Sequence, residues 1–196
     1  MKTSKLLLAL FAAAGLSFAG GIQAAMTTMS KDAHDTAYTN ADAQYKSDKA
    51  SCGSLSGNAK DICMEEAKGK EKVAKAEADA AYKGTPKARE SARLAHADAR
   101  YSVAKEKCDD MTGNSKDVCV KEAKATYVKA KADAKVDRVA SDTTNTAVQK
   151  TAEAKRDAEE DKRDANYKVA IEKCDSLAGT AKDNCVRDAK ARYGKS

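Results

Sequence analysis

Residues 98–124 read DARYSVAKEKCDDMTGNSKDVCVKEAK, and this stretch decides the fold because the chain contains three versions of it. The other two are residues 42–68, DAQYKSDKASCGSLSGNAKDICMEEAK, and residues 164–190, DANYKVAIEKCDSLAGTAKDNCVRDAK. In each copy a tyrosine precedes the first cysteine by seven residues, and ten residues separate the two cysteines. Such self-similarity is typical of proteins that use one supersecondary unit several times.

The spacing within one copy predicts two helices joined by a tight turn. Tyr101, Cys108 and Met111 lie seven and three residues apart, which places them on one face of a helix. Gly113 is expected to end that helix, and Asn114 to cap the next one. Each arm then carries one cysteine close to the turn, so two antiparallel arms bring the cysteines face to face.

Pairing within each hairpin is therefore the expected disulfide pattern. Six cysteines allow fifteen pairings in principle, but one pair per repeat favours the local one. A bridge closing so short a loop contributes about 3 kcal/mol in the chain-entropy model. The expected bridges join Cys52 to Cys63, Cys108 to Cys119, and Cys174 to Cys185.

The cysteine spacing argues against zinc binding, redox-active dithiols and covalent haem attachment. Zinc sites favour short spacings such as C-x2-C with further Cys or His ligands, and neither His34 nor His96 recurs with the repeat. The C-x-x-C motif of redox dithiols and the C-x-x-C-H motif of covalent haem attachment are both missing from the sequence. We predict no metal and no cofactor.

The N-terminal 25 residues have the pattern of a cleaved secretory signal peptide. Lys2 and Lys5 precede an apolar stretch from Leu6 to Ala19, and Ala24 and Ala25 offer a cleavage point. We therefore expect an exported, periplasmic protein without stable membrane insertion after cleavage. Export also places the cysteines in an oxidising compartment.

Charge and composition predict a helical protein whose helices contact one another through small apolar side chains. Removing residues 1–25 takes away two lysines and no acid, so the net charge falls from +6 to +4. Acids alternate with bases along the chain, which argues against nucleic acid as a partner because phosphate binding concentrates unopposed positive charge. Tryptophan is missing and both phenylalanines lie in the signal, while the strong helix formers Ala, Lys and Glu are abundant.

The predicted fold class is all-α, with three disulfide-stapled antiparallel helical hairpins arranged as a bundle or as an elongated coiled-coil-like rod. Gly84, Thr85 and Pro86 mark a boundary between helices, as a helix-ending glycine, an N-cap and a first-turn proline. The expected units are the signal peptide 1–25, hairpin 26–84, hairpin 85–140, a linker or helix break at 141–146, and hairpin 147–196.

No residues converge into a catalytic site in the sequence, and we predict that the protein is not an enzyme. His34 and His96 are expected to be ordinary helix residues. The recurring Lys-Asp pairs are attributed to electrostatics at helix starts. The tyrosines could form a binding stripe, but packing beside the bridges is the interpretation adopted for Tyr45, Tyr101, Tyr127, Tyr167 and Tyr193.

The repeated Y-x6-C-x10-C-x3-AK pattern with its G-N-x-K-D turn resembles a group of small exported proteobacterial proteins. They are labelled cell envelope biogenesis protein TolA. The resemblance covers the whole chain after the signal. Its likeness to true TolA is limited to helical, Ala- and Lys-rich composition, and we expect no counterpart of the TolA anchor and C-terminal domain. The resemblance implies a periplasmic protein associated with the envelope.

These observations favour a non-enzymatic helical scaffold or interaction protein whose partner is a protein or another envelope component. The alternative is a periplasmic stress protein that holds unfolded clients on its Ala-lined seams. Self-association into homo-oligomers is compatible with those narrow seams. Co-purification with one envelope component would favour the scaffold, and suppression of client aggregation would favour the chaperone.

Overall fold

The computed structural model describes residues 28–141 and 146–195, and within them it confirms an all-helical fold without strands. The expected signal peptide lies outside the described residues, as does most of the expected linker at 141–146. A 3-10 turn, Cys52–Ser54, follows the first helix. The six helices are α1 (Lys31–Ser51), α2 (Gly57–Lys83), α3 (Pro86–Cys108), α4 (Gly113–Ala140), α5 (Ala147–Cys174) and α6 (Gly179–Tyr193).

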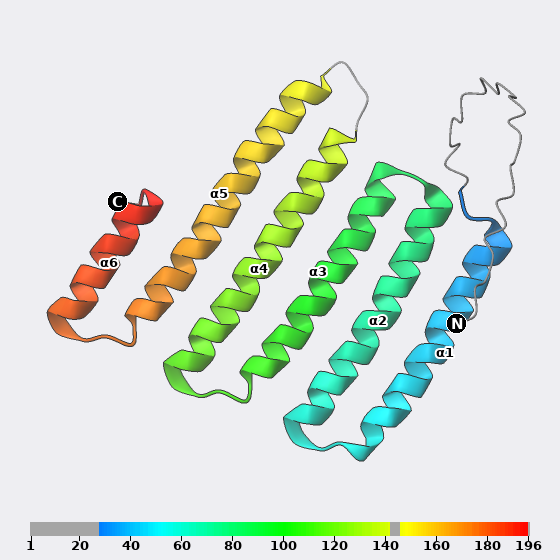
Figure 1. Ribbon diagram of the computed structural model, residues 1–196, viewed down its shortest axis with the longest axis horizontal. Coiled ribbons are helices and arrows are strands. Elements are labelled where there is room, and N and C mark those ends of the chain that lie inside the picture. The colour runs from blue at the N-terminus through cyan, green and yellow to red at the C-terminus, as the bar shows by residue number, and fades with distance from the viewer. Residues whose placement is uncertain (1–27, 142–145, 196) are drawn as a thin grey trace, which may run out of the picture.

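The helices lie side by side in chain order and alternate in direction, as Figure 1 shows. Among the described residues, each helix contacts only the helices that precede and follow it in the chain. These contacts fit an antiparallel bundle, opened out into a single layer with two exposed faces. The three disulfide-bearing turns lie along the same edge of the layer, the lower edge in Figure 1.

Side-chain caps start α1 and α3, and a glycine ends α2. Ser30 Oγ accepts a hydrogen bond from the Ala33 amide at 3.2 Å and starts α1. Thr85 Oγ1 accepts from the Ala88 amide at 3.1 Å, with Pro86 in the first turn of α3. Gly84 ends α2 at a left-handed φ of +60°.

The turn between the two arms of a hairpin differs from the expectation in one respect. α3 ends at Cys108, before Met111, and Gly113 is the first residue of α4 rather than the end of α3. Its φ is +57°, and the equivalent Gly57 and Gly179 have φ of +56° and +54°. A glycine recurs here because the chain enters the second helix through a left-handed conformation that side chains with a Cβ disfavour.

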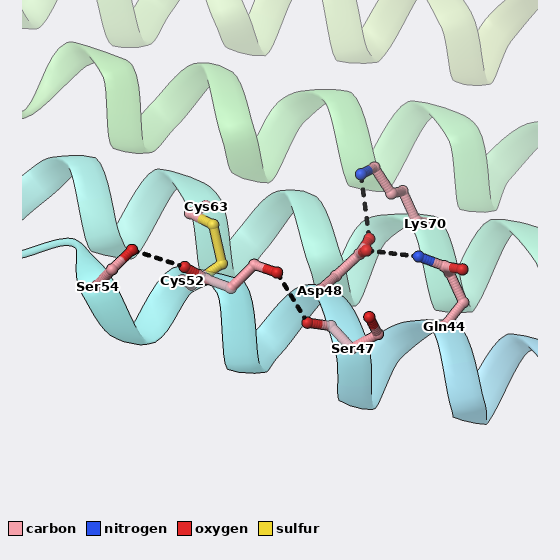
Figure 2. Close-up of a disulfide and its surroundings, with 8 residues drawn as sticks. Gln44, Ser47, Asp48, Cys52, Ser54, Cys63 and Lys70 are labelled. Carbon is pink, nitrogen blue, oxygen red and sulfur yellow. Dashed lines mark hydrogen bonds and ion pairs between the residues drawn. A yellow bond between two sulfur atoms is a disulfide. The ribbon is translucent and has the colours of Figure 1, made fainter.

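The predicted bridges are confirmed in all three hairpins. Each joins cysteines whose Cα atoms are 5.7 Å apart, within the usual range for a disulfide. The first cysteine of each pair is completely buried. Figure 2 shows Cys52 and Cys63 linking the end of α1 to α2, beside Asp48, which accepts hydrogen bonds from Gln44 Nε2 at 2.6 Å and Lys70 Nζ at 3.1 Å.

Small residues form the core. Every side chain that is fully buried in the described residues belongs to alanine or cysteine, and no polar side chain there is buried. Two helices approach closely at Gly69 of α2, where an added Cβ would lie 2.8 Å from the Ala99 Cβ of α3. A single layer of helices has no enclosed interior, so tight lateral contact between backbones replaces a thick core.

Candidate interaction grooves between the hairpins

An asparagine at the start of the second helix of one hairpin holds the next hairpin in register. Asn58 Nδ2 donates to the Glu106 carbonyl at 2.9 Å, and Asn114 Nδ2 donates to the Glu172 carbonyl at 3.0 Å. The predicted capping role of Asn114 is therefore wrong, because its side chain reaches across to α5. The third hairpin has Thr180 at this position.

An ion pair recurs beside each asparagine contact. Glu66 of α2 lies 3.9 Å from Lys107 of α3, and Glu122 of α4 lies 2.6 Å from Lys173 of α5. These pairs are exposed, so each contributes at most about 1 kcal/mol. Their recurrence nevertheless fixes the same relation between hairpins 1 and 2 as between hairpins 2 and 3. In α1, Ser51 replaces the lysine.

A groove of about 500 Å³ runs between α2 and α3, and we call it groove A. Its apolar lining is formed by half-buried side chains of Val73, Ala99, Val103 and Ala104, with Gly69 beside them. Its polar lining consists of the charged residues Glu66, Lys70, Arg100 and Lys107, together with His96.

A second groove of about 900 Å³, groove B, lies over α4 and α5 and reaches α6. Ala125, Val169 and Ala170 line it, together with Tyr193 of α6. Its acidic residues are Glu122 and Glu159, and its basic residues are Lys129, Lys162, Arg163, Lys173 and Arg192.

Groove B is the repeat equivalent of groove A. The counterparts of Glu66, Gly69 and Val73 lie 56 residues later, and those of Val103 and Lys107 lie 66 residues later, as the two repeat offsets require. Equivalent positions of a regular array point to the same side. The two grooves therefore open on one face of the layer, which we call the groove face.

Basic residues outnumber acidic ones in the lining of both grooves. Groove A has three Lys or Arg residues against one acid, and groove B has five against two, a joint net charge of +5 with histidine neutral. Residues 26–196 as a whole carry only +4. The remainder of that chain is therefore close to neutral. Alternating signs in the sequence hide this local excess, because it arises only when α2, α3, α4 and α5 lie side by side.

The tyrosines expected to pack near the bridges are all half-buried. Tyr101 and Tyr127 stack with ring centroids 5.0 Å apart, and Tyr167 meets Tyr193 edge-on at 6.2 Å. A hydrogen bond with Asp98 raises the pKa of Tyr127 to about 12. Tyr45 has no tyrosine opposite it, because the counterpart of Tyr127 in α2 is Glu71.

The two histidines lie in different surroundings. His34 Nε2 is 2.8 Å from Asp79 Oδ1, which also accepts a hydrogen bond from the Tyr38 hydroxyl at 2.9 Å. The hydrogen bond to Asp79 is the main reason that the pKa of His34 is raised. The pKa of Asp79 is lowered to about 2, mainly by the hydrogen bond from Lys83 and next by the one from His34. His96 Nε2 lies 2.6 Å from Glu77 on the side of groove A.

The lysine of the repeated Lys-Asp pair has a more specific contact than helix-start electrostatics. Lys116 Nζ lies 2.7 Å from Asp109, and Lys182 Nζ lies 2.8 Å from Asp175, so each lysine closes its own turn. The first hairpin has Gly53 at the aspartate position. The sequence could have predicted this ion pair, because Asp follows the first cysteine only in the second and third repeats, where the pair forms.

No group of three or more His, Cys, Asp or Glu in the described part of the chain is placed to hold a metal ion. No described helix is long and apolar enough to cross a membrane. The three bridges indicate an oxidising, extracytoplasmic environment. No protein-family model, curated protein or solved structure matches the chain.

Proposed function

We propose that this protein is a non-enzymatic scaffold of the periplasm that presents its groove face to a protein or another envelope component. The observation that carries the proposal is the pair of equivalent grooves on one face of a disulfide-stapled layer. Enzymes enclose their reacting groups, whereas these grooves are open and repeated, which suits recognition of an extended or repeated partner.

The bridges and the N-terminal sequence support the compartment. Disulfides persist where the environment is oxidising, and the apolar segment after Lys2 and Lys5 has the pattern of an export signal. The resemblance to the exported TolA-labelled proteins points to the same compartment and to the envelope.

In-cell crosslinking tests the scaffold role. The tagged protein is expressed from its full sequence, crosslinked in intact cells and purified under denaturing conditions, and its partners are identified by mass spectrometry. We expect one reproducible envelope component. Crosslinks only to a diffuse set of abundant proteins, or only between copies of this chain, would overturn the proposal. An unrelated exported helical protein with the same tag is the control.

A row of exposed apolar side chains favours the chaperone as a second candidate. Leu55, Met111 and Leu177 occupy equivalent positions in the three turns and are 41%, 44% and 43% exposed. The three turns that contain them lie along one edge of the layer (Figure 1). If the protein holds unfolded clients through this row, replacing all three with Ser abolishes suppression of aggregation of a reduced, unfolded test protein. Suppression that persists in the triple variant excludes the row as the client site.

A further inference from the structure

We infer that the groove face binds an acidic amphipathic helix of a partner protein, with the helix lying along the grooves, its apolar side chains on the valine and alanine lining and its carboxylates beside the groove cations. This inference rests on the proposed function and names the partner's chemistry. It follows from the shape, lining and charge of the two grooves together.

The shape suits a helix. Groove A lies between two antiparallel helices that are in contact at Gly69 and Ala99. A groove between two helices accepts the ridge of side chains of a third helix. Val73 and Val103 provide the apolar contact in groove A, and Val169 does so in groove B. A row of partner side chains at i, i+3, i+4 and i+7 matches such a strip.

The charge selects an acidic helix. Arg100 in groove A, and Lys129 and Arg163 in groove B, are exposed, and no carboxylate of the described residues forms an ion pair with any of them. Among the other groove cations, Lys107 pairs with Glu66 and Lys173 pairs with Glu122. Arg192 lies over the ring of Tyr193. The three unpaired cations are therefore available to carboxylates flanking the partner's apolar row.

The same face is poorly suited to a nucleic acid or another polyanion. Glu66, Glu122 and Glu159 line the grooves among the cations and would repel closely spaced phosphates. Binding of single strands also uses aromatic side chains on which bases stack, and the apolar lining of groove A is Val, Ala and Gly. An amphipathic helix uses both the apolar and the basic parts of the grooves.

The test uses the oxidised chain without its signal and a designed probe. The probe is a fluorescently labelled peptide of about 20 residues, long enough to form a helix of about 30 Å. It has Leu and Ala on one face and Glu on both flanks. Its dissociation constant is measured by anisotropy at about 0.15 M salt, where long-range charge effects are screened. A peptide with Lys in place of Glu and a polyphosphate of similar charge are the competing ligands.

The groove variant is Arg100→Glu with Arg163→Glu, one reversal in each groove. Its matched control is Lys105→Glu with Lys168→Glu, which makes the same change of charge on the same two helices. Each control position lies five residues beyond its groove counterpart, about 140° around the helix, and both control lysines are exposed. Circular dichroism and thiol titration verify that all proteins are helical and fully oxidised.

We expect the acidic peptide to bind the wild-type chain, and the groove variant to bind it at least about tenfold more weakly, as expected when two favourable exposed contacts become repulsive. The control variant should change the affinity less than about threefold. Equal losses in both variants, no measurable binding of the acidic peptide, or equal binding of polyphosphate would overturn the inference.

In-cell crosslinking of the same two variants separates this inference from the proposed function. If the wild-type protein has one envelope partner and the groove variant retains it, the grooves are not the site, while the scaffold role stands. If the partner is lost only from the groove variant, both are supported. If the wild-type chain has no reproducible partner, the proposed function is overturned.

Discussion

Alanine fills the helix contacts that larger side chains occupy in most helical proteins. The buried set is alanine and cysteine only, and a methyl group contributes little apolar area compared with Leu or Phe. Stability therefore depends on how closely backbones approach, on capping residues such as Ser30 and Thr85, and on a few polar contacts between helices. Substituting a single small residue at these contacts should therefore change the free energy of unfolding substantially.

Gly69 is one such residue. Replacing it with Val places a side chain where even a Cβ would lie 2.8 Å from the Ala99 Cβ, so α2 and α3 must move apart. We expect a loss of about 1–3 kcal/mol in the free energy of unfolding, measured by urea denaturation. Gly53→Val is the control, because no atom lies within 4 Å of an added Cβ there, and it should change stability by less than about 0.5 kcal/mol. Similar losses in both variants would contradict the role given to Gly69.

His34 makes stability depend on pH near neutrality. Its pKa is raised above the ordinary 6.5 in the folded protein, chiefly by the hydrogen bond to Asp79, so protonation favours the fold. This contribution is complete below pH 6.5 and is lost as the pH rises through the folded-state pKa. The melting temperature should therefore fall between pH 6 and pH 8, and His34→Gln should remove that fall. His96→Gln, which leaves His34 and Asp79 in place, should retain it.

At the scale of helices and turns, the repeat predicted most of what is observed. The pattern of Tyr, Cys and Gly was sufficient for six helices and three bridges, because each hairpin is a local structure whose parts are close in sequence. The roles of Asn58 and Asn114 were missed because their acceptors lie 48 and 58 residues away in the next hairpin. The grooves were missed for the same reason, since they require the lateral register of two hairpins.

Asn58 and Asn114 should set how firmly one hairpin docks on the next. Changing either to Ala removes a side-chain hydrogen bond to the neighbouring hairpin, and we expect each to lower the free energy of unfolding by about 1 kcal/mol. Thr180→Ala is the matched control, because no described helix follows α6. Hydrogen exchange should quicken at the ends of α3 or α5 that face the altered residue. Unchanged exchange in the asparagine variants would show that the ion pairs alone maintain the register.

The bridge of the third hairpin should matter most for α6. This helix has 15 residues and, among the described helices, contacts only α5, so its lateral support is the smallest in the layer. Replacing Cys174 and Cys185 with Ala removes a staple that contributes about 3 kcal/mol. We expect the amides of α6 to lose protection against exchange while those of α2 and α3 keep theirs. A uniform change along the chain would mean that the six helices unfold as one unit.

At the scale of the whole molecule, α1 and α6, the outermost described helices, differ from the helices between them. The interior helices carry the residues that dock hairpins, whereas the outer ones depart from the pattern: Ala50 and Ser51 in α1 replace Glu and Lys, and Thr180 in α6 replaces Asn. The uncovered side of α5 has Glu160 and Arg163 where α3 has the half-buried Leu94 and the buried Ala97. Polar ends of this kind cap repeat arrays and limit their growth.

An array in which only neighbours touch should also be divisible at a hairpin boundary. Stability in such an array is roughly the sum of each unit and its contacts with adjacent units, and the described helices contact only their neighbours. A chain of residues 26–141 keeps two hairpins, two bridges and groove A, so we expect native-like helicity per residue, a lower melting temperature and unchanged affinity for any ligand of groove A.

The matched comparison is a chain of residues 26–111, cut inside the second hairpin. It leaves Cys108 without Cys119, uncovers the side of α3 that α4 covers, and removes Tyr127, the stacking partner of Tyr101. We expect α3 to exchange its amides rapidly in this chain although its sequence is intact. If both shortened chains unfold completely, the fold is cooperative across all three hairpins. Each hairpin would then depend on the full layer.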